Sequence, residues 1–512
     1  MAGGIQDFQA GERASGMIRI RCISHDGVRE IDAEEGISLQ TILRRSGYDI
    51  YSPCGGRGRC GKCTVWVSGV GKVISCRYKP TSDTEVILPG ENEAGILVRQ
   101  TEFLEDFPFN REISPGLSNS PIGVAIDLGT TTVVLYFLNL IDGAIEKIAS
   151  FLNPQMRFGS DVISRITYCQ ENDTGLQELQ NAITERINFE TDTFLTGRGL
   201  VSGNLEKIVV AGNTTMLHLL LGEDPVPIAL APFTPKFTSK QIKKGDSSKI
   251  SINPEGHLIT LPCLSAYVGA DIIAGLAVLK PLFKNYLFVD IGTNGEIALV
   301  TGSTVYACSA AAGPAFEGAS ISCGMAAVTG AVSGFSDDGE IQVIGNIAPA
   351  GICGSGIVDI VAYLVRKGIV DGTGFMKDPF VIHEANAIKV TRQDIREIQL
   401  AKSAIFSGIR ILMKRAGIGF GDVEALYLAG GFGNYISIRS AVDLGLLPEE
   451  LDGRIFAVGN SAGIGALQYL RSDEIESRIG RLIENSIYVD LSEAEDFPEE
   501  FAMNMDFQQR SV

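Results

Sequence analysis

The chain has 512 residues, of which 45% are hydrophobic and 20% charged, a composition typical of globular proteins with two to four domains. Its formal net charge of −18 argues against general nucleic-acid binding, because a phosphate backbone requires clustered cations. The sequence contains no run of about 18 apolar residues, and residues 1–16 lack the apolar segment of a signal peptide. We therefore expect a cytoplasmic protein that has no membrane partner.

The charge is distributed unevenly along the chain. Residues 1–90 hold 12 Lys and Arg against 10 Asp and Glu, a surplus of +2, so the remaining residues carry −20. The two parts are therefore expected to have different surfaces and different partners.

Residues 17–90, which follow an extension at 1–16 expected to be disordered, are predicted to form a small domain. Its expected elements are strands at 17–23 and 28–31 around a turn at 25–27, a helix capped by Ser38, and strands at 64–67 and 85–88. A glycine- and cysteine-rich loop precedes the last two strands. A hairpin, a helix, a ligand loop and closing strands together predict a β-grasp fold.

Four cysteines of this domain have the spacing C-x5-C-x2-C-x12-C: Cys54, Cys60, Cys63 and Cys76. Four thiolates complete the coordination of two tetrahedral irons bridged by sulfide, and the intervening glycines let the loop turn tightly around a cluster. The pattern resembles the ferredoxin superfamily in its five-residue-gap variant, although the hairpin between the third and fourth ligands must be short. Zinc is the alternative, but zinc ribbons usually present two C-x2-C pairs. We expect one 2Fe-2S cluster.

Basic residues surround this loop: Arg57, Arg59, Lys62, Lys72, Arg77 and Lys79. They either compensate the negative charge of the cluster or form a docking surface for an acidic redox partner. The other six cysteines are scattered among apolar and glycine-rich segments and are expected to be buried structural thiols: Cys22, Cys169, Cys263, Cys308, Cys323 and Cys353.

Residues 91–120 contain many Pro, Gly, Ser and Glu residues and are predicted to be a linker that acts as a mobile tether. At the other end of the chain, residues 491–512 are acidic. We expect this tail to be a solvated extension.

Between these segments, residues 121–490 are predicted to form an α/β core. Apolar strands that end in Gly- and Thr-rich turns alternate with helical patterns, the clearest at 174–196 and 391–415. The strand-turn sequences at 124–132 and 288–296 are closely related, which indicates a duplicated domain with two lobes.

Three turns of this core have the chemistry of a magnesium-nucleotide site, since a carboxylate can position hydrated Mg²⁺ while glycine amides and Thr hydroxyls approach phosphate oxygens. They resemble the loops of the acetate and sugar kinase, Hsc70 and actin superfamily. The phosphate-1 loop comprises Asp127, Gly129, Thr130, Thr131 and Thr132; the phosphate-2 loop comprises Asp290, Gly292, Thr293, Asn294, Gly295 and Glu296; the adenosine loop comprises Gly430, Gly431, Phe432, Gly433 and Asn434. Together they predict ATP binding by an actin-like, ribonuclease H-like ATPase core.

Asp127, Asp290 and Glu296 are the expected catalytic residues. Glu296 and Asp271 are candidates to orient the attacking water, although buried or capping carboxylates are commoner. Lys402 is a candidate nucleotide contact, with a solvated lysine as the alternative. Residues 212–216 are a candidate helix start near the site, and residues 351–356 are either a phosphate-facing turn or a tight packing contact.

The combination of a 2Fe-2S domain, a linker and this ATPase core resembles the reductive activators of corrinoid proteins. The stretches that carry the resemblance are residues 54–63, 153–155, 159–165, 211–216, 312–318, 354–359 and 430–434. Some members insert a middle domain before the ATPase core, and it is expected to be absent here because Asp127 follows the linker almost at once.

The resemblance implies an ATP-dependent oxidoreductase that reduces an inactive Co(II) corrinoid protein of a methyltransferase system to Co(I). It implies 2Fe-2S, ATP and Mg²⁺ as cofactors, an upstream donor (a ferredoxin, a flavodoxin or a reductase) and, as a further expectation, a homodimer. Two alternatives remain open. A nucleotide-gated sensor or scaffold would hold a cluster that does not cycle reversibly, and a small-molecule kinase with a regulatory ferredoxin domain would release a phosphorylated product.

Overall fold

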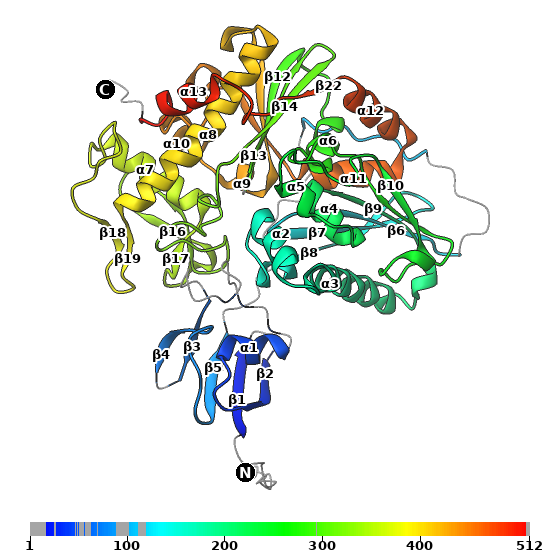
Figure 1. The fold of residues 1–512 in the computed structure, drawn as a ribbon, viewed down its shortest axis with the longest axis vertical. Helices are drawn as coiled ribbons and strands as arrows, with labels where there is room; N and C mark the ends of the chain where they lie inside the picture. The colour runs from blue at the N-terminus through cyan, green and yellow to red at the C-terminus, as the bar shows by residue number, and fades with distance from the viewer. Residues whose placement is uncertain are drawn as a thin grey trace, which may run out of the picture. The chain divides into compact units, whose positions relative to one another are not determined.

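The computed structural model describes residues 17–24, 27–46, 48, 50, 56, 63–68, 70–88, 102–110, 119–292 and 294–507. The chain divides into two compact units after Glu91, next to the expected boundary at residue 90. Figure 1 shows the elements of both units coloured along the chain. Within the described part of the chain, no helix is both long enough and apolar enough to cross a lipid bilayer.

The first unit is a five-stranded mixed sheet with one helix. Its elements are β1 (Met17–Ser24), β2 (Gly27–Glu34), α1 (Leu39–Arg45), β3 (Thr64–Val67), β4 (Gly71–Ile74) and β5 (Thr84–Ile87). The strand order is β2-β1-β5-β3-β4, in which β1 and β5 are parallel and the other neighbours antiparallel. Alternation along β1 buries Ile18, Ile20 and Cys22 in the core while Arg21 is exposed.

The predicted local signals of this unit are confirmed. β1 and β2 form the expected hairpin, with Ser24 opposite Gly27. Ser38 is the N-cap of α1, where its hydroxyl accepts a hydrogen bond from the amide of Thr41 over 3.3 Å.

The second unit contains two lobes, each built on a six-stranded sheet. The first lobe comprises β6 (Ile122–Leu128), β7 (Thr132–Asn139), β8 (Ile145–Leu152), α2 (Val162–Glu171), α3 (Gly175–Gly197), β9 (Leu205–Gly212), α4 (Thr214–Leu221), α5 (Val226–Ala229), β10 (Gln241–Lys244), β11 (His257–Thr260) and α6 (Ala270–Ala277). The long helix α3 covers one face of this sheet, where Phe194 stacks on Phe137 of β7 (Figure 1).

The second lobe begins at β12 and carries an additional small subdomain. It comprises β12 (Asn285–Ile291), β13 (Gly295–Thr301), β14 (Thr304–Ala310), β15 (Ala331–Phe335), β16 (Ile341–Val343), β17 (Gly351–Ile352), α7 (Gly354–Arg366), β18 (Phe380–His383), β19 (Ile388–Val390), α8 (Arg392–Ala416), β20 (Ala425–Ala429), α9 (Gly430–Tyr435), α10 (Ile438–Asp443), β21 (Ile455–Gly459), β22 (Ser486–Tyr488) and α13 (Phe497–Met503). Two helices that follow β21 pack on the first lobe instead: α11 (Ser461–Arg471) on β6, β9 and α6, and α12 (Asp473–Glu484) on α6.

The two large sheets repeat one topology. β6 pairs antiparallel with β7 and parallel with β9, and β12 pairs in the same way with β13 and β20. The full orders, β10-β11-β9-β6-β7-β8 and β21-β20-β12-β13-β14-β22, extend this correspondence to the flanking strands. This is the duplication that the repeated strand-turn sequence predicts.

The two predicted long helices are present as α3 and α8. Thr391 caps α8 through a capping box with Asp394, and Gly417 ends it in the left-handed conformation, with φ of +69°. Helix α8 covers β13 and β14 of the second sheet.

Part of the expected tether is packed against the second unit. Leu104 and Phe107 are buried in the core of the first lobe. The amide of Glu105 donates to the carbonyl oxygen of Val278 over 2.7 Å. Residues 102–110 are therefore not a free linker, because their apolar side chains and backbone groups have partners in the core.

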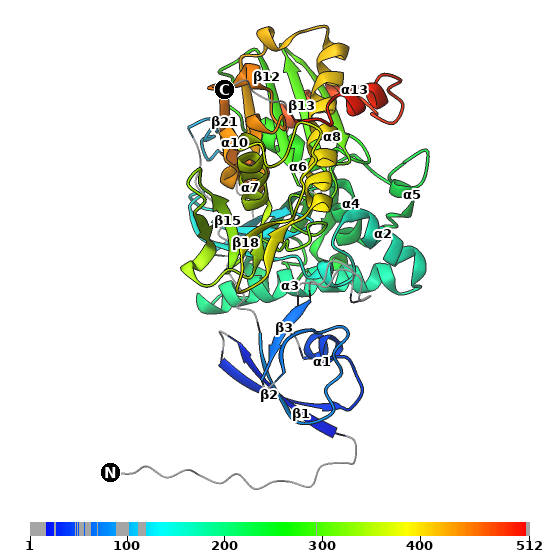
Figure 2. The same cartoon turned by 90° about the vertical axis from the view of Figure 1, so that its left-hand side faces the viewer.

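The expectation of a solvated C-terminal tail is wrong for residues 493–507. Helix α13 lies along α8 (Figure 2), and its Glu500 pairs with Arg410 over 2.7 Å and with Lys414 over 2.6 Å. Phe507, 3% exposed, packs in the core of the second lobe. The negative charge that suggested a solvated segment is partly neutralised by basic residues of α8.

Candidate functional site

The predicted nucleotide loops follow strands whose carboxyl ends lie side by side. In the first lobe Asp127 of β6 is in register with Ala211 of β9, and in the second lobe Asp290 of β12 is in register with Ala429 of β20. Ligands of open α/β sheets bind at this edge. The phosphate-1 loop and residues 212–216 thus come together in one lobe, and the phosphate-2 and adenosine loops in the other.

The phosphate-1 loop is a tight turn that requires glycine. The amide of Gly129 donates to the carbonyl oxygen of Thr132 over 3.1 Å, and a Cβ atom on Gly129 would lie 2.4 Å from that oxygen. Asn153 holds the turn from outside: its side-chain amide donates to the carbonyl oxygen of Gly129 over 2.8 Å, and its main-chain amide donates to that of Thr131 over 2.8 Å.

Arg165 and Asn213 complete the support of this loop. The fully buried guanidinium of Arg165 donates to the carbonyl oxygens of Thr130, over 2.5 Å, and Gly159, over 3.0 Å. Burial lowers the pKa of Arg165 to about 10, so it remains charged at neutral pH. The Asn213 amide donates to the hydroxyl oxygen of Thr130 over 2.9 Å, which leaves the hydroxyl proton available for a ligand.

The phosphate-2 and adenosine loops touch. Gly430 has φ of +77°, and a Cβ atom there would lie 2.3 Å from Oδ1 of Asp290. Gly295 packs against Ile405 of α8. Phe432 packs against Phe316, with ring centroids 5.1 Å apart. Thr293 and the side chain of Asn434 lie outside the described part of the structure.

Four carboxylates from the two lobes share one environment: Asp127, Asp271, Asp290 and Glu296. Burial and then the charges of Asp271 and Asp290 raise the pKa of Asp127 to about 8. Burial raises the pKa of Asp290 to about 7, with Asp271 as the second cause, and that of Asp271 to about 6. The pKa of Glu296 lies well above its ordinary value for the same reasons. A cation would relieve this accumulated charge.

Among the described residues, no three Asp, Glu, His or Cys side chains lie close enough to ligate one metal ion. Mg²⁺ usually keeps several water ligands and is bound through one or two carboxylates together with substrate phosphates.

The weaker candidates have different outcomes. An oxygen of the Asp271 carboxylate accepts the adjacent amide of Ile272 over 3.0 Å, and Glu296 accepts the amide of Gly269 from the other lobe over 3.4 Å. Lys402 is not solvated: it is 2% exposed, its Nζ donates to the carbonyl oxygen of Asp506 over 2.5 Å, and burial lowers its pKa to about 8. Its place in the C-terminal packing corrects the expectation of a solvated lysine.

The turn at 351–356 is a tight packing contact at the start of α7. A Cβ atom on Gly354 would lie 1.8 Å from the carbonyl oxygen of Phe316, and one on Gly356 would lie 2.1 Å from that of Val332. Neither position tolerates a side chain, because main-chain atoms cannot yield as a flexible side chain can.

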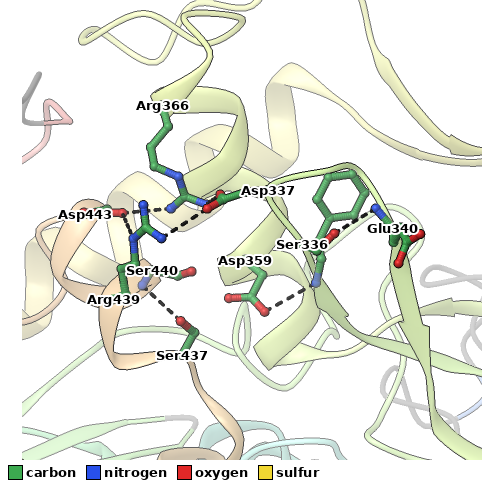
Figure 3. A network of polar contacts seen from close by, with 10 residues as sticks. Ser336, Asp337, Glu340, Asp359, Arg366, Ser437, Arg439, Ser440 and Asp443 are labelled. Atoms are coloured by element: carbon green, nitrogen blue, oxygen red, sulfur yellow. Dashed lines mark hydrogen bonds and ion pairs between the residues drawn. The ribbon is translucent and has the colours of Figure 1, made fainter. Parts of the chain in front are cut away.

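Figure 3 shows how α7 is fixed to α10, which follows the adenosine loop. Arg366 of α7 pairs with Asp443 of α10 over 2.8 Å and with Asp337 over 2.7 Å (Figure 3). Arg439 also reaches Asp337, over 3.1 Å. Asp359 accepts the amide of Phe335 over 3.4 Å. This network joins α7 to α10 and to the turn that carries Asp337.

In the first unit, Cys63 and Cys76 are described, whereas Cys54 and Cys60 lie outside the described residues. Cys63 is fully buried and Cys76 partly exposed. The β3-β4 hairpin pairs Thr64 with Ile74, and the amide of Ser75 donates to the carbonyl oxygen of Cys63 over 2.7 Å. Of the six other cysteines, Cys169 and Cys323 are only partly buried and the rest are buried.

Several supporting residues had no role in the sequence interpretation. Asn153, Arg165 and Glu317 all lie within stretches that carry the family resemblance, which was the only signal for them. Their partners are main-chain carbonyls and a hydroxyl of the phosphate-1 loop, and such contacts leave no pattern in a single sequence.

Comparison with known proteins agrees with these features. Residues 284–512 match the family model described as the C-terminal domain of RACo, the ASKHA domain, and residues 122–280 match the RACo middle region. The region that the family model describes as the middle one is therefore present here as the first lobe, and the expected absence of a further domain before Asp127 stays a prediction.

The chain is 31% identical to the corrinoid activation enzyme RamQ of Eubacterium limosum, over 93% of this chain and 97% of that protein. It is 25% identical to the [Co(II) methylated amine-specific corrinoid protein] reductase of Methanosarcina barkeri, over 64% and 66%. A solved structure of a reductive activator for corrinoid, iron-sulfur protein aligns with a TM-score of 0.68 and 28% identity, over 95% of this chain and 98% of that one. This chain belongs to the RACo family of corrinoid-protein activators.

Proposed function

We propose that this chain is an ATP-dependent iron-sulfur enzyme that reduces a Co(II) corrinoid protein of a methyltransferase system to Co(I). The names of the relatives supply the substrate class, since one is named a corrinoid activation enzyme and the other a reductase of a Co(II) corrinoid protein. The main support for ATP dependence is the close approach of Gly430 to Asp290, which brings the adenosine and phosphate-2 loops together. The phosphate-1 loop is held in place by Asn153 and Arg165. Mg²⁺ would be held as a hydrated ion beside Asp127 and Asp290.

We assign a single 2Fe-2S cluster to Cys54, Cys60, Cys63 and Cys76. Supporting this, the Ser75 to Cys63 hydrogen bond brings Cys76 back beside Cys63 within one short hairpin. Gly56, with φ of +86°, would place a Cβ atom 2.5 Å from Gln40 of α1, so the loop needs glycine where it meets the helix. The sheet order and single helix of this unit also suit a ferredoxin-like β-grasp domain.

The cluster would supply one electron at a time. Reduction of a Co(II) corrinoid is uphill for an ordinary ferredoxin of about −400 mV. For one electron, each ~59 mV of mismatch corresponds to ~1.4 kcal/mol. ATP assists if its binding and hydrolysis change the affinity of the second unit for the corrinoid protein. We further propose a cytoplasmic location, a ferredoxin, flavodoxin or reductase as electron donor, and a homodimer.

The test is to mix the full chain anaerobically with a candidate Co(II) corrinoid protein from a methyltransferase system, a reductant and ATP. Absorbance spectra report Co(I), and we expect it to form only when ATP is present. If Co(I) fails to appear with every such corrinoid partner, the proposal is wrong. A phosphorylated small molecule in the mixture would favour a kinase instead.

The cluster assignment has its own test. Cys63→Ser should lose the bound iron and the electron paramagnetic resonance signal of the reduced cluster while retaining ATP binding. Cys22→Ala is the matched control, because Cys22 is equally buried in the same sheet but lies outside the motif. Zinc in place of iron in the anaerobically purified protein would contradict the assignment.

A further inference from the structure

A hydrogen bond joins the two lobes at the phosphate-1 loop. The Thr131 hydroxyl donates to Oε1 of Glu317 over 3.0 Å, although the two residues are 186 positions apart. Both side chains are partly exposed, so the contact borders the solvent-accessible part of the site. A carboxylate of the second lobe is therefore hydrogen-bonded to a hydroxyl of the loop that is expected to hold the terminal phosphates.

Glu317 stands on a rigid turn. Its amide donates to the carbonyl oxygen of Pro314 over 3.2 Å, and Gly318 follows with φ of +75° against the backbone of Met325. Phe316 is 3% exposed and packs on Phe432 of the adenosine loop. The carboxylate of Glu317 is thus fixed by contacts with the phosphate-1 loop and, through Phe316, with the adenosine loop. Little reorganisation is needed before it can act on a bound nucleotide.

Other carboxylates of the site are already held by main-chain groups of the protein. Asp271 and Glu296 accept main-chain amides, at Ile272 and Gly269, and lie among like charges. Asp290 is pressed against Gly430. Glu317 instead accepts a hydrogen bond from the Thr131 hydroxyl, which a γ-phosphate could also accept. The buried guanidinium of Arg165 lies close enough to interact with the negative charge of Glu317.

We propose that Glu317 is the catalytic carboxylate that orients the attacking water in ATP hydrolysis, a role that rests on the proposed ATP site. When the γ-phosphate accepts the Thr131 hydroxyl, Oε1 of Glu317 is released and accepts a hydrogen bond from water. The water oxygen bonds to the γ-phosphorus, and the bond from the γ-phosphorus to the β,γ-bridging oxygen breaks with its electron pair on ADP. The proton of the water passes through Glu317 to solvent, and inorganic phosphate leaves.

The experiment compares Glu317→Gln and Glu317→Asp with the wild-type full chain. Affinity for Mg-ATP is measured by calorimetry, and hydrolysis by single-turnover release of phosphate across pH. We expect Glu317→Gln to bind Mg-ATP within about threefold of wild type but to hydrolyse it at least ~100-fold more slowly, without the acidic limb of the pH profile. Glu317→Asp should recover part of the rate. Glu340→Gln, at an exposed position, is the control and should match wild type.

Two results would overturn this role. One is hydrolysis by Glu317→Gln within threefold of wild type; the other is an equal loss of binding and hydrolysis, which would mean that Glu317 only holds the loop. Failure of the proposed ATP site itself is distinguishable, because the wild-type chain would then show no binding of Mg-ATP at all.

Discussion

The guanidinium of Arg165 donates a hydrogen bond to the carbonyl oxygen of Thr130 over 2.5 Å, from a side chain with no exposed surface. The same group also donates to the carbonyl oxygen of Gly159. A buried cation that satisfies several main-chain oxygens fixes their positions, and removing it leaves them unpaired. The conformation of the phosphate-1 loop thus depends on a residue that lies 35 positions further along the chain than Thr130.

We therefore expect Arg165→Met to lower the free energy of unfolding by about 3 kcal/mol or more and to weaken Mg-ATP binding. Denaturant unfolding and calorimetry measure the two effects. Arg198→Met is the control, because Arg198 forms a half-exposed ion pair with Glu146 that should contribute about 1 kcal/mol or less. Equal stability of the Arg165 and Arg198 variants would show that the buried guanidinium does not hold the loop.

Adjacent glycines of the adenosine loop should respond differently to substitution. Gly430→Ala would force a Cβ atom to 2.3 Å from Oδ1 of Asp290 at a φ of +77°, whereas a Cβ atom on Gly431 meets nothing within 4 Å. We expect Gly430→Ala to cost about 2 kcal/mol or more and to abolish Mg-ATP binding. Gly431→Ala should stay within about 1 kcal/mol of wild type. The melting temperatures of both variants test this, and similar values would contradict the close contact.

The raised pKa of Asp127, about 8, predicts how stability changes with pH. The folded protein retains a proton on Asp127 over a range where the unfolded chain has lost it, so this group makes the free energy of unfolding fall as pH rises from about 4 to about 8. The slope is at most ~1.4 kcal/mol per pH unit for one such group.

Asp127→Asn removes that dependence. We therefore expect the difference in melting temperature, variant minus wild type, to increase from pH 5 to pH 8 when it is measured without nucleotide and Mg²⁺. The variant should also have no ATPase activity. Asp142→Asn is the control, because Asp142 lies in an exposed turn and should give a constant difference. A constant difference for Asp127→Asn as well would mean that the carboxylate is not held protonated.

The three glycine-rich turns could be predicted from sequence because each is a local pattern of strand, glycine and hydroxyl residues, whereas their binding of nucleotide stays a prediction. The capping box of Thr391 and Asp394 likewise made the start of α8 predictable. The residues that support the loops could not be found this way, since Asn153 and Arg165 act through main-chain atoms that any residue would provide. Glu317 meets Thr131 only in the folded chain, since the two residues are 186 positions apart in the sequence.

The C-terminal segment was misinterpreted for a physical reason. Its acidic residues indicate solvation when they are counted without their partners, but Arg410 and Lys414 of α8 neutralise Glu500. Lys402 gave the same kind of error, because its charge suggested an exposed or ligand-facing position although a main-chain carbonyl of the same segment accepts its hydrogen bond. Composition therefore fails where two segments distant in sequence compensate each other.

This packing yields a final prediction about two residues near the C-terminus. Phe507 is 3% exposed and its ring lies 5.4 Å from Nζ of Lys402, whereas Met503 is 74% exposed on the same segment. Because truncating a buried aromatic side chain removes apolar burial and leaves a cavity, Phe507→Ala should lower the free energy of unfolding by about 3 kcal/mol. Met503→Ala should change it by less than about 0.5 kcal/mol. Denaturant unfolding of both variants measures these free energies. Equal values would indicate a solvated tail, whereas a tail packed against the second lobe should make Phe507→Ala clearly less stable than Met503→Ala.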